Sequence, residues 1–387
     1  MVKFPCCLMF LPLLCAWPSA DAQDATLEEE ELNRQVAEME KELLEEVSVW
    51  DHSTNLRLGG GYKENVTLSA FAEESSPFVS TGLDFMAIRI PLAEDGVEVT
   101  IFGSLDDRRY FDTEVVDREQ TGLLNVNLEK PLAEKWSLDT DIRVIYIDEI
   151  FDASLTEDDI GTVQVVGKQI SLVPALRRDL PGNTWIEAGP EVTRQYFAEP
   201  LDGYLEIGGR LSTGVDYGFQ SKLFLYAETL RRDYDTRSQR DEIGFYIPDS
   251  DLSYDRPEYG VEWAHYWDSD RRLRMRTRWS ILENKDSGSG YFDYRRERVS
   301  HGWRYRGESL SLAATVRKAT YEYALQRSAD FLDVRARADL SWDITLGYEY
   351  NDHLTFQLGY EQESINSNVP QDEYRYRVYT AGIDWEF

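Results

Sequence analysis

The stretch LDVRARADLSWDITLGYEY, residues 332–350, alternates between two kinds of residue. Its even positions, from Leu332 to Tyr350, are all apolar or aromatic, whereas its odd positions from Asp333 to Asp343 are charged or carry a hydroxyl group. A period of two is that of a β-strand whose two faces meet different surroundings. Strands in soluble sheets usually have five or six residues, so a two-faced strand of this length predicts another kind of sheet.

The same alternation recurs from residue 53 to the last residue, with clusters of Gly, Asp, Asn, Pro and Ser between the segments. Such clusters mark turns between antiparallel strands. The glycine-rich segments 54–63 and 203–213 leave the count open between about fourteen and eighteen strands. The pattern predicts sixteen, near 54–63, 78–90, 96–106, 120–130, 135–150, 163–177, 184–197, 203–213, 218–231, 258–267, 271–283, 293–305, 309–323, 330–350, 354–364 and 374–387.

The links between these segments alternate in length. Short ones, such as NDH (351–353) and RGE (306–308), are followed by longer polar ones, such as NKDSGSG (284–290) and SNVPQDE (367–373). This is typical of a transmembrane barrel, with tight turns at one end, long loops at the other, and side chains that alternate between lipid and lumen. Closure satisfies every backbone polar group where no water is present. The prediction is therefore an all-β chain: a transmembrane antiparallel β-barrel of about 16 strands, preceded by a short acidic α-helix.

The end of the chain, RVYTAGIDWEF (377–387), has the same two faces. Its apolar set resembles the C-terminal signal that the barrel-assembly machinery reads in outer-membrane β-barrels of Gram-negative bacteria: Tyr379, Ala381, Ile383, Trp385 and Phe387. The stretch 346–387 is also similar to the last hairpins of β-barrel porins associated with exopolysaccharide gene clusters. These resemblances imply a cell outer-membrane location, contact with outer-membrane lipid and lipopolysaccharide, and a role in transport.

Residues 1–22 have a cation at Lys3, an apolar core and small residues Ala20 and Ala22, which predicts a secretory signal peptide cut after Ala22. All three cysteines lie inside it, so no disulfide framework is expected; acylation of Cys15 in a lipoprotein is the alternative. Residues 23–50 are expected to form an acidic periplasmic helix, and 51–387 the barrel. The helix would assemble a homotrimer, dock to an export partner, plug the lumen, or act as a solvated spacer.

The composition excludes some classes of partner. The 387 residues carry a formal net charge of −31, which argues against nucleic acid because binding it requires basic side chains. Aromatic residues make up 13% of the chain, and such rings are enriched where lipid meets water.

The charges of a barrel that face its lumen can be assigned by strand parity. Four arginines recur at every second position of 271–283, and others follow on the next strands, so we expect an arginine ladder opposite an acidic wall. The predicted basic lining is Arg272, Arg274, Arg276, Arg278, Arg296, Arg298, Arg304, Arg335 and Arg337. The predicted acidic lining is Glu98, Asp106, Glu129, Asp139, Asp141, Glu187 and Glu191. The alternative is that these charges pair across neighbouring strands and only stiffen the wall.

No enzymatic site is expected. A nucleophile needs a base, most often His, but the four His lie before the first strand (His52), in a turn (His353), or on the lipid side (His265 and His301). We therefore predict no catalytic residue, no metal site and no cofactor.

The sequence predicts a passive porin-like channel for small polar solutes or saccharides. The alternatives are a conduit for exopolysaccharide export, a plugged fatty-acid-type transporter, and a structural surface barrel. The longest link, 231–257, contains EIGFYI (242–247), which would either fold inward as a constriction or extend a hairpin above the membrane.

Overall fold

The computed structural model describes residues 48–91, 96–152, 162–328 and 330–387. The predicted signal peptide and most of the predicted acidic helix lie outside these residues. The predicted boundary between helix and barrel at residue 51 is wrong, because the first strand already begins at Ser48. Among the described residues, no helix is long and apolar enough to cross a membrane.

The sixteen predicted strands are all present, and the two glycine-rich segments are among them. Most strands are a few residues longer than predicted. Their bounds are β1 (Ser48–Glu64), β2 (Ser76–Pro91), β3 (Glu98–Tyr110), β4 (Arg118–Ala133), β5 (Trp136–Asp152), β6 (Thr162–Leu180), β7 (Thr184–Phe197), β8 (Tyr204–Tyr217), β9 (Ser221–Tyr234), β10 (Ser253–Tyr266), β11 (Leu273–Asp286), β12 (Tyr294–Arg306), β13 (Leu310–Arg327), β14 (Val334–Asn351), β15 (Leu354–Ser367) and β16 (Tyr374–Glu386), with a single 3-10 turn, η1 (Pro370–Asp372), between the last two.

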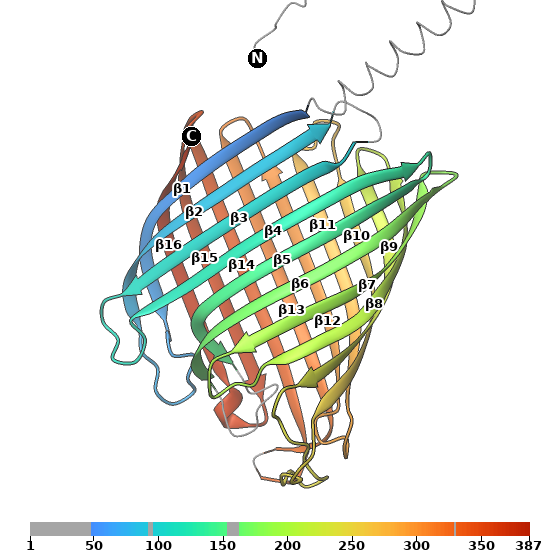
Figure 1. The fold of residues 1–387 in the computed structure, drawn as a ribbon. Coiled ribbons are helices and arrows are strands. Elements are labelled where there is room, and N and C mark those ends of the chain that lie inside the picture. Colours follow the sequence, from blue (N-terminus) through green and yellow to red (C-terminus); the bar gives the residue numbers. More distant parts are fainter. Residues whose placement is uncertain (1–47, 92–95, 153–161, 329) are drawn as a thin grey trace, which may run out of the picture. The chain divides into compact units, whose positions relative to one another are not determined.

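The strands form one closed antiparallel ring in which each strand pairs with its neighbours in sequence (Figure 1). The last strand returns to the first, with Tyr62 opposite Tyr379 and Leu56 opposite Trp385. Glycine makes this seam possible, because a Cβ atom at Gly61 would collide with the backbone carbonyl of Tyr379. Closure leaves no unpaired sheet edge.

The two ends of the barrel differ in the length of the links between the strands. The turns at one end are short, such as 352–353 between β14 and β15, and we call this the short-turn end. The loops at the other end are longer, such as 235–252 between β9 and β10, and we call it the long-loop end. The start of β1 and the end of β16 both lie at the short-turn end (Figure 1).

The two faces of the wall follow the predicted alternation. Large apolar side chains on the outer face are exposed in the isolated barrel, including Leu346, Tyr348, Trp385 and Phe387. Leu332 is the exception to the predicted outward set, because β14 begins only at Val334 and Leu332 lies in the preceding loop.

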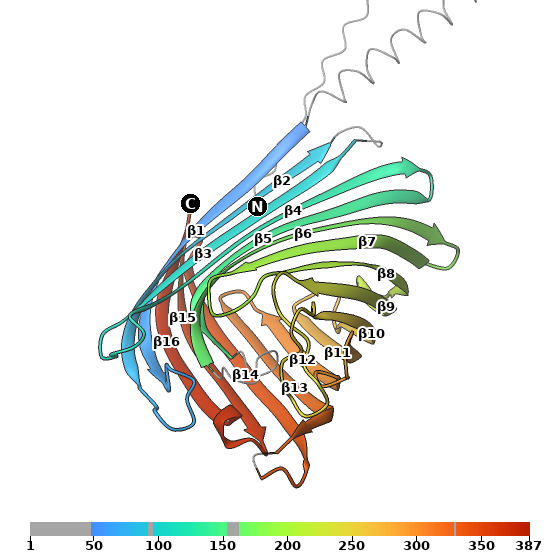
Figure 2. The same cartoon turned by 60° about the horizontal axis from the view of Figure 1, so that its bottom comes forward.

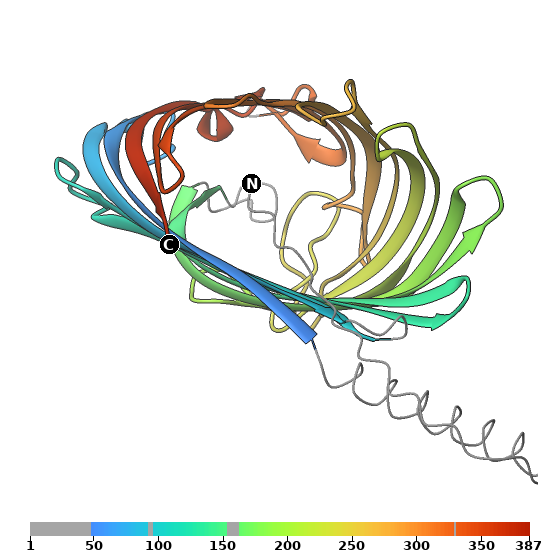
Figure 3. The same ribbon diagram turned by 90° about the horizontal axis from the view of Figure 1, so that it is seen from above.

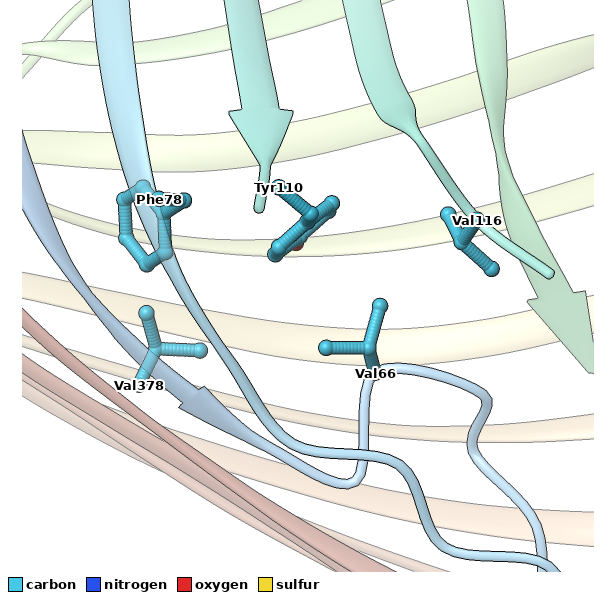
Figure 4. Packing of buried hydrophobic residues seen from close by; sticks show 5 residues of the cluster. All are labelled: Val66, Phe78, Tyr110, Val116 and Val378. Atoms are coloured by element: carbon cyan, nitrogen blue, oxygen red, sulfur yellow. The ribbon is translucent and has the colours of Figure 1, made fainter. Parts of the chain in front are cut away.

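The buried apolar residues form small clusters at the long-loop end instead of one core. The largest joins Val66, Phe78, Tyr110, Val116 and Val378, which come from β2, β3, β16 and two loops (Figure 4). These clusters hold the loops against the inner wall, since the ring itself has no packed centre.

Candidate functional site

At the long-loop end, β5 and β6 leave the barrel wall and turn into the lumen. The last pair between β4 and β5 is Gln120 with Asp148, and the first between β6 and β7 is Gly167 with Phe197. Beyond these pairs, β5 and β6 continue to pair with each other as far as Asp152 and Thr162. Figures 2 and 3 show the green ends of these strands inside the ring. We call the described part of this hairpin, residues 149–152 and 162–166, the inward tip.

The inward tip crosses the lumen and docks on the far wall. Asp152 forms an ion pair with Arg337 of β14, with an N···O distance of 2.8 Å, although seven strand steps separate β5 from β14 along the shorter way round the ring. Ile150 packs against the cluster that contains Leu68, Ile365 and Tyr374. The docked tip therefore narrows the passage at the long-loop end.

We expect Asp152→Asn to loosen this docking, because the buried guanidinium of Arg337 then loses its partner on the tip. In planar bilayers the variant should show higher single-channel conductance and more frequent current fluctuations. The matched control is Asp339→Asn, which removes the other carboxylate that pairs with Arg337 but lies on β14 itself. Equal currents for the wild type and both variants would contradict a constriction by the tip.

The loop 235–252 does not continue β9 and β10 as a regular hairpin, but it contains a short hairpin of its own. Arg240 and Tyr246 form an isolated bridge, and the backbone amide of Ile247 donates a hydrogen bond to the carbonyl of Gln239. Hydrogen bonds from Ser289 to Arg240 and from Gln239 to Ser287 attach it to the neighbouring loop 287–293. Ile243 remains exposed.

The predicted arginine ladder is present on β11 and β12, with one correction. Cross-strand partners share a face, and Arg274, Arg276 and Arg278 lie opposite Arg304, Gly302 and Ser300. Arg296 and Arg298 continue the inner row of β12.

Arg272 does not belong to the ladder, because β11 begins only at Leu273. It lies in the turn 267–272, where the Asp268 carboxylate accepts hydrogen bonds from the backbone amides of Arg272 and Leu273. These amides hold the pKa of Asp268 below its ordinary value. Alternation alone could not find this turn, since Arg272 has the same parity as the strand residues.

Two glutamates on β10, which are not among the predicted lining residues, neutralise part of the ladder. Glu262 accepts two hydrogen bonds from Arg276, both 2.7 Å long. Glu258, 8% exposed, accepts from the Tyr226 hydroxyl at 2.7 Å and pairs with Arg278 and Arg296 at 3.1 and 2.9 Å. The two glutamates have even numbers, as Tyr254 and Tyr266 do, whereas the outward residues of β10 have odd numbers. The alternation in the sequence could therefore have identified both glutamates.

The remaining ladder arginines have no acidic partner. Arg274, Arg298 and Arg304 form no ion pair with any residue that the structure describes, and neither does Arg317 of β13, which was not predicted. The ladder thus combines the two alternatives: some arginines stiffen the wall through ion pairs, and others keep their charge toward the lumen.

The predicted acidic wall lies on the inner face of β3 to β7. The cross-strand series Glu98, Glu129 and Asp139 places three carboxylates side by side. Glu187 of β7 lies on the same face, opposite Arg177 of β6. Glu191 and Asp141 share this face, as does Asp106, which pairs with Arg57 at 3.0 Å. Because β5 and β13 lie half-way round the ring from each other, the acidic wall faces the arginines (Figure 1).

Arg335 and Arg337 lie on the inner face of β14 but are buried, with 6% and 4% of their surfaces exposed. Arg335 pairs with Asp372 of η1 at 2.6 Å, and Arg337 holds the inward tip. Both arginines therefore anchor segments that fold into the barrel.

His265 and His301 face outward, as predicted, whereas His52 does not precede the first strand but lies within β1. His265 stacks between Tyr217 and Trp263, and His301 packs edge-on against Trp303. Within the described part of the chain, no group of three or more His, Cys, Asp or Glu side chains could hold a metal ion.

Comparisons with known proteins found similar structures but no family. No protein-family model matches the chain, and no curated protein matches it. Among solved structures, OccK9 (OpdG) of Pseudomonas aeruginosa is 9% identical, with 87% of this chain and 98% of that chain covered and a TM-score of 0.47. OccAB4 of Acinetobacter baumannii is 10% identical, with 87% and 98% covered and a TM-score of 0.44. An anion-selective porin from Comamonas acidovorans is 9% identical, with 88% and 100% covered and a TM-score of 0.42. Similarity this low carries no argument about function.

Proposed function

We propose that this chain is an outer-membrane channel of the porin-like kind, which lets small polar solutes pass passively. The observation that carries the proposal is the arrangement of the wall: apolar side chains cover its outer face, and charges of opposite sign face each other across its interior. A barrel of about sixteen strands is wide enough to hold a water-filled passage.

The charge pattern favours polar solutes over apolar ones. Some arginines on β11 to β13 and some carboxylates on β3 to β7 form no ion pair with a described residue. Their charges produce a field across the lumen, which the surrounding low-dielectric wall strengthens. A hydrated ion or a hydroxylated molecule exchanges hydrogen bonds with such a lining. A fatty acid would gain nothing there and would have to displace ordered water.

The outer face supports placement in a membrane. Aromatic side chains gather at the short-turn end, where Trp385, Phe387 and Phe356 lie on neighbouring strands. Amphipathic rings are enriched at membrane boundaries. Placement in the outer membrane, with lipopolysaccharide around the barrel and insertion by the barrel-assembly machinery, follows the C-terminal pattern of Tyr379, Ile383, Trp385 and Phe387 and is part of the proposal.

Planar bilayer recordings on the refolded chain test the proposal. We expect stepwise insertion of a steady conductance that scales with salt concentration, from protein whose gel migration changes on heating. A barrel that migrates as folded but conducts no current would be a plugged transporter or a structural barrel, and would contradict the channel. Export of a polysaccharide would instead require a passage for a polymer, which release of long dextrans from liposomes would reveal.

A further inference from the structure

The inward tip lines a side chamber of about 730 Å³, whose other lining residues come mainly from β12 to β16 and from β1 to β4. Leu68 and Ile150 are among its apolar lining residues, and Tyr374, Tyr376, Glu361 and Glu363 are among its polar ones. The chamber is distinct from the ladder, because of the ladder residues only Arg298 reaches its edge.

Most cations of the chamber are already neutralised by carboxylates. Lys63 pairs with Glu119 at 2.7 Å, and Arg57 pairs with Asp84 and Asp106 at 3.0 Å each. Arg337 holds Asp152 and Asp339, at 2.8 and 2.7 Å. These groups therefore contribute little net charge to the cavity.

Four carboxylates of the chamber lack such a partner. Glu149 of the inward tip, Glu361 and Glu363 of β15 and Asp384 of β16 form no ion pair with a described residue, although Asp384 accepts a hydrogen bond from Gln357. Glu361 and Glu363 accept hydrogen bonds from the hydroxyls of Tyr376 and Tyr374, at 2.6 and 2.8 Å. These hydrogen bonds orient the carboxylates but supply no positive charge. Among the cations that line the chamber, only Arg298 forms no ion pair with a described residue, so the described lining has an excess of negative charge.

One ammonium group, that of Lys63, already lies in the wall of the chamber beside aromatic rings. The Nζ atom of Lys63 lies 5.8 Å from the centre of the Tyr110 ring and 5.4 Å from that of the Tyr376 ring. Its positive charge is compensated by an ion pair with Glu119. An ammonium between aromatic faces and a carboxylate is the usual arrangement for binding organic cations. Tyr374 and Tyr376, stacked with centroids 6.5 Å apart, present the same combination beside Glu361 and Glu363.

We propose that this side chamber binds a small organic cation with a primary ammonium group, held by Glu361, Glu363 and Glu149 beside Tyr374 and Tyr376. The inference deepens the proposed function and rests on it, since the solute reaches the chamber through the lumen. The carboxylates compensate the charge of the ammonium, and the rings exclude water from its methylene chain.

Three four-carbon probes that differ only in their end groups test the proposal: 1,4-diaminobutane, 1,4-butanediol and succinate. Each is titrated into the full-length refolded channel during bilayer recording. We expect 1,4-diaminobutane to reduce the current at millimolar concentration, with little effect of the neutral and anionic probes. Glu361→Gln combined with Glu363→Gln should raise the half-blocking concentration at least tenfold.

Glu228→Gln is the matched control, because Glu228 faces the lumen from β9, outside the chamber, and also forms no ion pair with a described residue. Its half-blocking concentration should stay within twofold of that of the wild type. Block by succinate, equal block by the diol, or an unchanged titration in the double variant would overturn the chamber proposal while leaving the channel intact. Absence of any conductance would count against the proposed function instead, and calorimetric titration of 1,4-diaminobutane in detergent would then decide on the chamber alone.

Discussion

Simultaneous replacement of Arg274, Arg298 and Arg304 with Ser is expected to shift the channel strongly toward cations. These three guanidinium groups face the lumen without an acidic partner among the described residues, so their charge acts on passing ions. The carboxylates of the opposite wall, such as Glu187 and Glu191, would then dominate the field. We expect the ratio of cation to anion permeability to rise roughly threefold or more, measured as the reversal potential in a salt gradient.

Arg272→Ser is the control for this experiment. Arg272 has the same side chain and the same sequence parity, but it lies in the turn 267–272 and pairs with Asp270 at 3.5 Å. Its replacement should leave the reversal potential unchanged. A shift as large as that of the triple variant would show that selectivity arises from the general charge of the protein and not from the ladder.

Glu258→Gln is expected to lower the stability of the barrel. Glu258 accepts a hydrogen bond from the hydroxyl group of Tyr226 and forms ion pairs with both Arg278 and Arg296. Without its charge, two neighbouring guanidinium groups face each other uncompensated. Breaking a buried ion pair typically costs about 3–5 kcal/mol, and the lower end of this range, about 3 kcal/mol, applies because Arg278 is partly open to the lumen. Urea unfolding in detergent, followed by tryptophan fluorescence, measures the change.

Glu228→Gln should not have this effect. Glu228 of β9 lies directly across from Glu258 of β10 on one side and from Arg210 of β8 on the other, so the loss of its charge removes one repulsion and one attraction. Its neutralisation is therefore expected to leave stability nearly unchanged. A similar loss of stability in both variants would indicate that any amide on this face disturbs the wall, and would remove the special role of Glu258.

Much of the fold could be read from the chain. All sixteen strands, the alternation of short turns and long loops, and the inner face of the acidic wall followed from a period of two and from turn residues. This works because a barrel wall separates two surroundings along its whole length, so every strand repeats the same alternation. The error at Arg272 arose where the alternation continues past the strand into a turn.

The ion-pair partners of the charged residues could not be predicted from the sequence. Whether an inward arginine is paired depends on the register between neighbouring strands, which brings Glu262 beside Arg276 but leaves Arg298 without a carboxylate. A shift of two residues would preserve both faces and change every pair, and sequence alternation cannot detect such a shift.

The sequence by itself determined which side chains face lipid and which face the lumen, because that choice depends only on the parity of each residue in its strand. The tertiary structure alone decided where the wall folds inward, since the inward tip is fixed by contacts of Ile150 and Asp152 with strands almost two hundred residues away. Those contacts form only once the ring has closed and brought β5 opposite β14, and no local pattern records them.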